Sequence, residues 1–251
     1  MTQNQNRIAL ITGASNSRDI GTAICRKLAS LGIDIFFTYW NSEDDWINQF
    51  KQELIDTGVH CENIKIDLSN ANAAFEILDT VQTKLGFPSI LVNNAAHSTR
   101  DGYLELDAKT LDKHYSVNMR STFLLSAEFA RRFEKASMNS GRIINMTSGQ
   151  ELGPMPGELA YVATKGAISA FTKSLSVELA PLGITVNAVN PGPTDSTWMN
   201  DEIRTYLLSK FPMGRVGLPE DVARIIAFLA SDESKWITGQ VIHSEGGYIR
   251  S

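Results

Sequence analysis

The 251-residue chain has few of the residues from which disulfide, metal and nucleic-acid sites are built. Its only two cysteines, Cys25 and Cys61, show neither metal-ligand nor redox spacing, so we expect ordinary thiols of a reduced cytoplasm. The four histidines are scattered without the spacing of a metal site, which favours no bound metal. A net charge of −5 argues against nucleic-acid binding, because phosphate recognition requires a basic face.

Membrane-spanning and linker-like segments are also missing from the sequence. No apolar run approaches the length needed to cross a bilayer, so we expect no membrane partner. Residues 1–6 are a short polar lead without the pattern of an export signal, which predicts a cytoplasmic location. With 43% hydrophobic residues and neither a linker nor a repeat, residues 1–251 are predicted to form a single domain.

Short apolar runs alternate with longer helical patterns along the whole chain. We expect strands at 8–12, 33–39, 63–67, 90–93, 142–146, 185–189 and 240–243. We expect helices at 22–31, 43–56, 71–85, 108–135, 158–179 and 219–230. This alternation predicts an α/β fold with three layers, in which a doubly wound, parallel, seven-stranded sheet lies between helices. Ligands bind such sheets beyond the carboxyl ends of the strands, where Thr12, Asp67, Asn93, Ser148 and Asn190 are expected.

The loop after the first expected strand has the features of a phosphate-binding turn. Gly13 and Gly21 allow the backbone to turn sharply and approach a pyrophosphate at a helix N-terminus, although an ordinary tight turn can contain them too. The second strand ends without a carboxylate, which favours NADP(H), because an acid there repels a 2′-phosphate. Arg18 is a candidate phosphate clamp, or else a solvated surface residue, and Ser15 can add a neutral hydrogen bond.

Three polar residues form a candidate proton donor for carbonyl reduction. Tyr161 and Lys165 stand four apart in a helical pattern, so their side chains lie one above the other. The lysine charge is expected to lower the pKa of the phenol, which would make Tyr161 a better acid. Ser148 follows a strand-like run and can hold a substrate oxygen.

An ordered series of motifs gives the chain a resemblance to a known family. The motifs are Thr12-Gly13…Gly21, Asp67-Leu68, Asn93-Asn94-Ala95-Ala96, Asn118, Ser148, Tyr161-x-x-x-Lys165, Pro191-Gly192, the run from Met213 to Ala223 and Ile237 to Gln240. In this order the chain resembles the short-chain dehydrogenase/reductase family, most closely its bacterial 3-oxoacyl-acyl-carrier-protein reductases. The resemblance implies a Rossmann fold and a catalytic set of Asn118, Ser148, Tyr161 and Lys165, with Asn118 holding a water of the proton relay.

The resemblance also implies a set of residues that bind NADP(H). Asp67 and Leu68 would contact adenine, Lys165 would hold the nicotinamide ribose, and Thr194 and Ser196 would anchor the carboxamide. The full implied set is Gly13, Ser15, Arg18, Ile20, Gly21, Asp67, Leu68, Asn93, Ala95, Tyr161, Lys165, Pro191, Gly192, Thr194 and Ser196.

Two positions depart from the family pattern. The phosphate loop is two residues longer than usual, and Asp19 stands where the middle glycine is expected. An anion there is unfavourable beside a pyrophosphate unless it turns outward or caps the helix that begins near Ile20, and we expect capping. Ala96 replaces a glycine and narrows the nicotinamide pocket slightly.

The substrate is predicted less sharply than the chemistry. We expect a lid near residues 194–215, mobile and helical over Trp198–Phe211, and substrate contacts from Ser148, Gln150, Tyr161 and Trp198. Carbonyl reduction is the first choice, including that of 3-oxoacyl thioesters, with the acyl carrier protein as a candidate partner. A dehydrogenase of a sugar, steroid or other secondary alcohol is the alternative. A regulatory cofactor-binding protein without catalysis is a third, against which the complete catalytic set argues. Homotetramers are implied by the resemblance.

Overall fold

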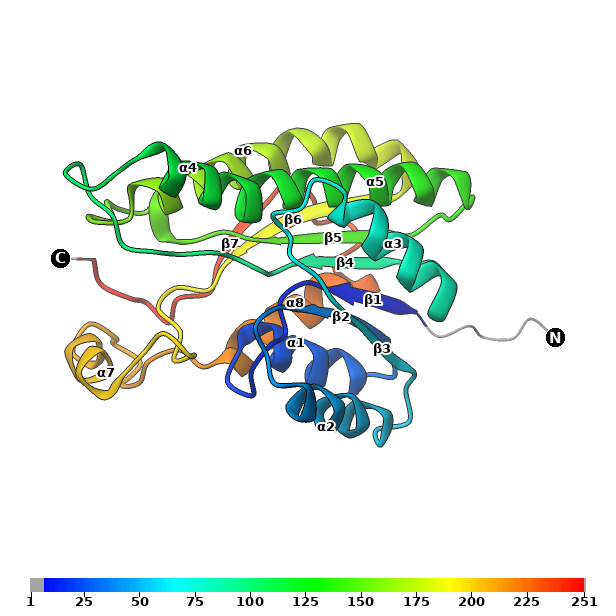
Figure 1. Ribbon diagram of the computed structural model, residues 1–251, viewed down its shortest axis with the longest axis horizontal. Helices are drawn as coiled ribbons and strands as arrows, with labels where there is room; N and C mark the ends of the chain where they lie inside the picture. Colours follow the sequence, from blue (N-terminus) through cyan, green and yellow to red (C-terminus); the bar gives the residue numbers. More distant parts are fainter. Residues whose placement is uncertain (1–6, 251) are drawn as a thin grey trace.

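A sheet of seven parallel strands forms the middle layer of the computed structural model, which describes residues 7–250 (Figure 1). The strands are β1 (Ile8–Ile11), β2 (Asp34–Tyr39), β3 (Cys61–Lys65), β4 (Ile90–Asn93), β5 (Gly141–Met146), β6 (Ile184–Asn190) and β7 (Val241–His243). They lie in the order β3-β2-β1-β4-β5-β6-β7, and every pair is parallel. The predicted doubly wound α/β fold is therefore confirmed.

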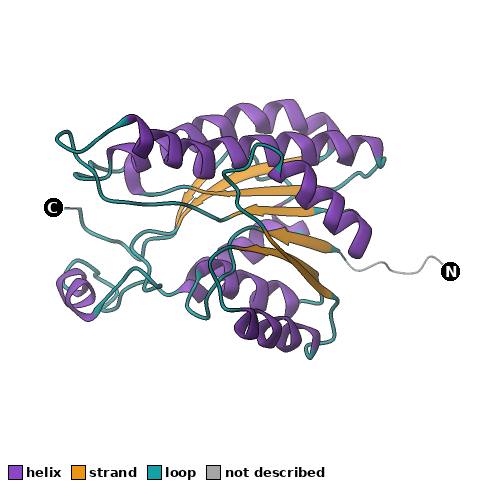
Figure 2. Ribbon diagram, viewed as in Figure 1, coloured by secondary structure: helices purple, strands orange, loops and turns teal. Residues whose placement is uncertain are grey.

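Helices cover both faces of the sheet, as Figure 2 shows. On one face lie α1 (Ile20–Ala29), α2 (Asp44–Ile55) and α8 (Pro219–Ala230), and on the other α3 (Ala73–Lys84), α4 (Ala108–His114), α5 (Ser121–Lys135) and α6 (Leu159–Leu179). A hydrophobic core lies on each face of the sheet, and strand β1 contributes to both because its alternate side chains point to opposite faces. Ala9 and Ile11 pack in the core beneath α1, α2 and α8, while Ile8 and Leu10 pack in the core beneath α3, α5 and α6.

The order of the strands creates a crevice beside β1. Connections from β1 lead to β2 and β3 on one side, whereas β4 and all later strands lie on the other side. Loops that leave the carboxyl ends of β1 and β4 therefore diverge, and a ligand crevice opens between them.

The long helix expected over residues 108–135 is interrupted. Helix α4 ends at His114, a π-helical turn follows over Tyr115–Arg120, and α5 begins at Ser121. The Thr122 hydroxyl, at the start of α5, donates to the carbonyl oxygen of Asn118 in this wider turn at 2.7 Å. Hydrophobic periodicity does not reveal one such wider turn inside a helix.

Most other bounds lie within two residues of the prediction, and two differ in a useful way. Strand β3 begins at Cys61 and ends at Lys65, two residues earlier than expected, because Cys61 pairs with Ile35 of β2. The lid contains a helix, α7 (Asp201–Leu208), shorter than the expected 198–211. A small apolar cluster of its own, Met199, Leu207, Phe211 and Val216, holds this segment together.

Candidate active site

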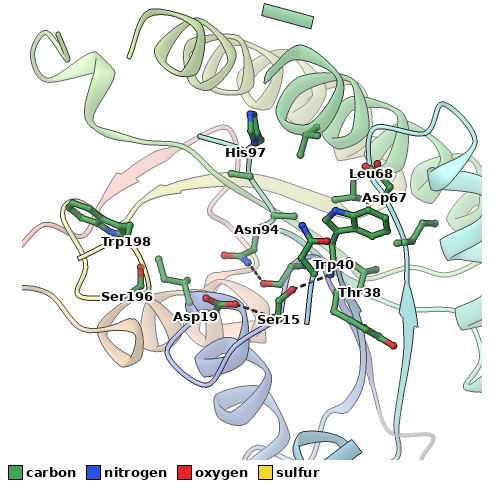
Figure 3. A pocket seen from close by; sticks show the side chains of 18 of the residues that line it. Ser15, Asp19, Thr38, Trp40, Asp67, Leu68, Asn94, His97, Ser196 and Trp198 are labelled. Atoms are coloured by element: carbon green, nitrogen blue, oxygen red, sulfur yellow. Dashed lines mark hydrogen bonds between the residues drawn. The ribbon is translucent and has the colours of Figure 1, made fainter. Parts of the chain in front are cut away.

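An open cavity of about 610 Å³ lies at the carboxyl edge of the sheet (Figure 3). Its walls come from the ends of β1, β2, β3 and β4, from the start of α1, and from the lid. The lining residues are Gly13, Ser15, Asp19, Ile20, Thr38, Tyr39, Trp40, Asn41, Ile66, Asp67, Leu68, Asn94, Ala95, Ala96, His97, Lys113, Val117, Ser196 and Trp198. This volume is in the range of small-molecule and cofactor sites.

The phosphate loop is locked against the end of β4. Gly13 has φ of +78°, and a Cβ there would lie 2.8 Å from Ala95 Cα, so only glycine fits. A Cβ on Gly21 would lie 2.1 Å from the Gly13 carbonyl oxygen. The side-chain amide of Asn94 donates to the carbonyl oxygens of Thr12 and Gly13, each at 2.9 Å. Both predicted glycines are thus required by close backbone approach.

Seven of the predicted cofactor residues line this cavity: Gly13, Ser15, Ile20, Asp67, Leu68, Ala95 and Ser196. Asn93 does not, because its amide donates to Ser126 Oγ at 3.0 Å and to Asn145 Oδ1 at 2.8 Å in the buried core. Thr194 is buried and donates to the carbonyl oxygens of Pro191 and Gly192 at 3.3 and 3.2 Å, which fixes the turn after β6.

Arg18 points to the lid and pairs with an acid there. Its Nη2 lies 2.7 Å from Asp195 Oδ1 and donates to the Ser196 carbonyl oxygen at 3.4 Å. Asp195 is held at the same time by Arg204, at 2.6 Å. The predicted phosphate clamp is therefore engaged with a carboxylate, and its role towards a phosphate stays a prediction.

The capping role expected for Asp19 is wrong. Asp19 precedes α1, but its carboxylate makes no capping bond to that helix. It turns back instead, so that Oδ2 accepts from the Ser15 amide at 3.1 Å while Oδ1 accepts from Thr197 Oγ1 of the lid at 3.4 Å. Burial raises the pKa of Asp19, partly offset by these hydrogen bonds.

Asp67 lies at the opposite end of the cavity, beyond β3. Burial alone would raise its pKa, but hydrogen bonds from Ser69 and the nearby charge of Lys113 outweigh burial and lower it. Asp67 is thus an ionised acceptor suited to a donor group of a ligand. Lys113 and Val117, four apart across α4 and the π-helical turn, line the same wall, and sequence reasoning missed both. Their shared helix face was the available signal.

Ser148, Tyr161 and Lys165 come together beyond β5, as the sequence predicts. Ser148, in the loop after β5, and Tyr161, in the first turn of α6, lie close enough for the serine hydroxyl to affect the phenol. Lys165 lies one turn further along, with Nζ 5.5 Å from the centre of the Tyr161 ring. The Lys165 ammonium is buried and donates to the Met146 carbonyl oxygen at 2.8 Å.

The expected fall in the pKa of Tyr161 is contradicted. Burial raises the pKa of Tyr161 to about 12, although its hydrogen bond with Ser148 lowers it in part. Burial also lowers the pKa of Lys165 to about 8, because an ammonium loses hydration in this pocket. The four-residue spacing places the two groups on one face of α6, but it does not report how much protein surrounds each of them.

Asn118 connects the cavity wall to the catalytic helix. Its Oδ1 accepts from the His97 amide at 2.6 Å, and its Nδ2 donates to the His97 carbonyl at 2.8 Å and to Thr164 Oγ1 at 3.1 Å. Thr164 in turn donates to the Tyr161 carbonyl oxygen at 2.8 Å. The π-helical turn thus places Asn118 as a strut between the β4 loop and α6. Its holding of a relay water stays a prediction.

Two of the predicted substrate residues, Ser148 and Tyr161, belong to this trio, and the other two are Trp198 and Gln150. Trp198 is 52% exposed and lines the cavity from the lid side. Gln150 donates to Ser169 Oγ at 3.2 Å, while its Oε1 is buried without a partner within residues 7–250. A buried unpaired acceptor is unusual, and it gives a substrate donor a place to bind. His97 adds an aromatic ring, whose centre lies 4.7 Å from that of His114.

No helix within residues 7–250 is long and apolar enough to cross a membrane. The same residues contain no group of three or more His, Cys, Asp or Glu side chains placed to hold a metal ion.

Known proteins resemble the chain over nearly its whole length. A family model described as Enoyl-(Acyl carrier protein) reductase matches residues 13–249. An uncharacterized oxidoreductase of Bacillus subtilis, YjdA, is 72% identical over 250 residues, which is 100% of both chains. The 3-oxoacyl-[acyl-carrier-protein] reductase FabG of Staphylococcus aureus is 36% identical over 245 residues, covering 95% of this chain and 96% of FabG.

A solved structure agrees with these sequence relatives. A short-chain dehydrogenase/reductase from Serratia marcescens is 34% identical, with a TM-score of 0.87 over 97% of this chain and 98% of that one. Proteins of this family use a nicotinamide cofactor and act on a carbonyl/alcohol pair. The chain therefore belongs to the short-chain dehydrogenase/reductase family of oxidoreductases.

Proposed function

We propose that the protein is an NADP(H)-dependent carbonyl reductase and that 3-oxoacyl thioesters are its first substrate class. The observation that carries the proposal is the convergence of Ser148, Tyr161 and Lys165 beyond the carboxyl end of β5. Two hydroxyl donors that lie close together can both face one substrate oxygen. A carbonyl oxygen that gains negative charge needs such donors, whereas a binding protein without catalysis does not.

The protein residues act on the substrate oxygen. The nicotinamide supplies the hydride, which forms the new C–H bond at the carbonyl carbon. Ser148 Oγ donates a hydrogen bond to the carbonyl oxygen and holds it against the Tyr161 phenol. Tyr161 transfers its proton to that oxygen, so the product is an alcohol and a phenolate remains. A high pKa of Tyr161 keeps the proton on the phenol until negative charge develops on the substrate.

Lys165, one helical turn from Tyr161, can return a proton to this phenolate. Its pKa of about 8 means that it gives up a proton far more readily than an exposed lysine does. When Lys165 is protonated, its charge would also stabilise the phenolate that the reaction leaves on Tyr161. The two groups are thus suited to pass one proton in either direction.

The preference for NADP(H) is supported by the neutral end of β2. Thr38, Tyr39, Trp40 and Asn41 line the cavity there, and none carries a negative charge that would repel a 2′-phosphate. Arg18 stands on the facing loop and would exchange Asp195 for this phosphate. We propose this exchange as the way in which the clamp predicted from the sequence operates.

The choice of substrate is supported by the relatives and by two exposed cations. The name of FabG gives a 3-oxoacyl-carrier-protein substrate for that relative. Arg131 and Arg132 are paired with Glu128 here and are poorly suited to a partner. Two exposed cations remain for an acidic carrier protein, Arg100 and Lys109. The Arg100 side chain is 82% exposed, and its distance of 4.0 Å from Glu158 is at the outer limit of an ion pair.

Assembly as a homotetramer in the cytoplasm completes the proposal. Phe123 of α5 and Phe171 of α6 stack at 3.8 Å and form an apolar surface with Leu124, which is 39% exposed. Trp236, which is 96% exposed, suits a second contact between C-terminal segments. Light scattering of the purified protein tests this, and a mass of one or two chains would contradict it.

A spectrophotometric screen tests the function. NADPH and NADH oxidation is followed with 3-oxoacyl thioesters, diketones, quinones and ketosugars, and a 2-enoyl thioester tests the reaction in the description of the matched family model. We expect turnover of 3-oxoacyl thioesters with NADPH favoured over NADH. Turnover of the enoyl thioester alone, or of secondary alcohols with NAD alone, would replace the proposal with that activity. Nucleotide binding without any turnover would favour a regulatory protein.

A further inference from the structure

Asp19 carries a negative charge into the part of the cavity where a phosphate is expected. It lines the cavity together with Gly13, Ser15 and Ile20. Figure 3 shows its side chain next to that of Ser15, in the loop before α1. An aspartate at this position ordinarily accepts hydrogen bonds from the first turn of its helix. Here it accepts from the Ser15 amide of the phosphate loop, at 3.1 Å from Oδ2. The carboxylate thus occupies the amide of a residue that lines the cavity.

A carboxylate and a phosphate compete for such a position. Both are anions that accept from backbone amides near a helix N-terminus, where the helix dipole favours negative charge. One amide cannot donate fully to both, and two anions at this separation repel each other. A pyrophosphate that reaches the start of α1 must therefore displace the Asp19 carboxylate or lie beside it at a cost in affinity.

The other carboxylate oxygen connects the loop to the lid. Thr197 Oγ1 donates to Asp19 Oδ1 at 3.4 Å, across 178 positions of sequence. A second connection lies next to it, where Arg18 pairs with Asp195 at 2.7 Å. Displacement of the Asp19 carboxylate would therefore break one of the three hydrogen bonds that join Arg18 and Asp19 to residues 195–197 of the lid.

We propose that Asp19 is a positioning residue that holds the Ser15 amide and Thr197 of the lid, and that the pyrophosphate of a dinucleotide displaces it. Asp19 then weakens nucleotide binding and links it to release of the lid. This inference rests on the dinucleotide site of the proposed function. The burial that raises the pKa of Asp19 is in accord with a carboxylate held inside the cavity.

The test compares nucleotide affinities of the wild type and Asp19→Asn. Asparagine has nearly the same shape and keeps one acceptor for the Ser15 amide, but it carries no charge. NADPH, NADH and inorganic pyrophosphate are titrated while the fluorescence of Trp40 and Trp198, which line the cavity, is followed. We expect all three probes to bind Asp19→Asn about fivefold to tenfold more tightly, as removal of one nearby like charge predicts.

Thr197→Val is the matched variant for the lid contact. It removes the hydroxyl that donates to Asp19 but keeps the charge, so we expect affinity within about twofold of the wild type. Amide hydrogen exchange of nucleotide-free protein is expected to rise around residue 197 in this variant and not around Ser15. Asp19→Ser replaces Asp19→Asn if the latter does not fold, with the same expectation for affinity.

Two results are decisive against the inference. Equal or weaker binding of NADPH and pyrophosphate by folded Asp19→Asn and Asp19→Ser would show that Asp19 orders the loop for the nucleotide instead of competing with it. Unchanged exchange around residue 197 in Thr197→Val would remove the link to the lid. Failure of the wild type to bind any dinucleotide would instead overturn the proposed function, so the two failures are distinguishable.

Discussion

Replacement of Lys165 by methionine removes a charge that is buried at a cost in folding stability. We expect the resulting gain in stability to be largest at neutral pH and to shrink as the pH rises. Lys165 is 2% exposed, and burial lowers its pKa from the usual 10.5 to about 8. The unfolded chain, where Lys165 is hydrated, therefore binds a proton more tightly than the folded protein does. Between these two pKa values the wild type gains stability as the pH rises. Below pH 8 it bears the full free-energy penalty of burying the charged ammonium.

The size of this penalty follows from the two pKa values. At about 1.4 kcal/mol for each tenfold difference in protonation, the lowering from 10.5 to about 8 costs the folded protein about 3 kcal/mol at pH 7. At pH 10 about 1 kcal/mol of it remains. Lys165→Met also leaves the Met146 carbonyl oxygen without its donor, which costs about 1–3 kcal/mol. That loss shifts the stability of the variant but does not titrate.

Urea unfolding of both proteins at pH 7, 8, 9 and 10 measures the effect. The stability of Lys165→Met minus that of the wild type is expected to fall by about 2 kcal/mol from pH 7 to pH 10. Lys235→Met, at an exposed position, is the control and should show a flat difference. A flat difference for Lys165→Met as well would refute the claim that Lys165 is buried at a cost. The variant should have no measurable turnover at any pH.

Three further outcomes follow from particular contacts. Gly21→Ala should abolish NADPH binding in titrations, because its Cβ would lie 2.1 Å from the Gly13 carbonyl oxygen, and normal affinity would contradict this geometry. Arg18→Ala should raise the KM for NADPH about tenfold and leave that for NADH unchanged, whereas equal changes would argue against a 2′-phosphate contact. Reversing the charges of Arg100 and Lys109 to Glu should raise the KM for a carrier-protein thioester at low salt but not for a small thioester, and equal KM values would exclude this docking surface.

The sheet and the catalytic trio were predictable because both depend on local patterns. Continuous apolar runs such as Ile8–Ile11 and Ile90–Val92 indicate strands covered on both faces, and their alternation with helices fixes a parallel sheet. The four-residue spacing of Tyr161 and Lys165 on one helix places them together whatever surrounds them. Gly13 and Gly21 were likewise recognisable, since only glycine permits the approaches found there.

The features that sequence reasoning missed depend on distant contacts and burial. Arg18 meets Asp195 across 177 positions, and Asp19 meets Thr197 across 178, so no local pattern reveals these partners. The pKa of Tyr161 depends on how much protein surrounds the phenol, which the spacing of charged residues does not report.

The central claim is that Tyr161 gives its proton to a carbonyl oxygen held by Ser148. Single-turnover oxidation of bound NADPH by a 3-oxoacyl thioester, measured for the wild type and Tyr161→Phe at equal nucleotide saturation, tests it most directly. Phenylalanine keeps the ring but has no proton to give, so we expect hydride transfer to slow by at least about a thousandfold, with the Kd for NADPH changed less than about threefold. Hydride transfer within about tenfold of the wild-type rate would contradict the account.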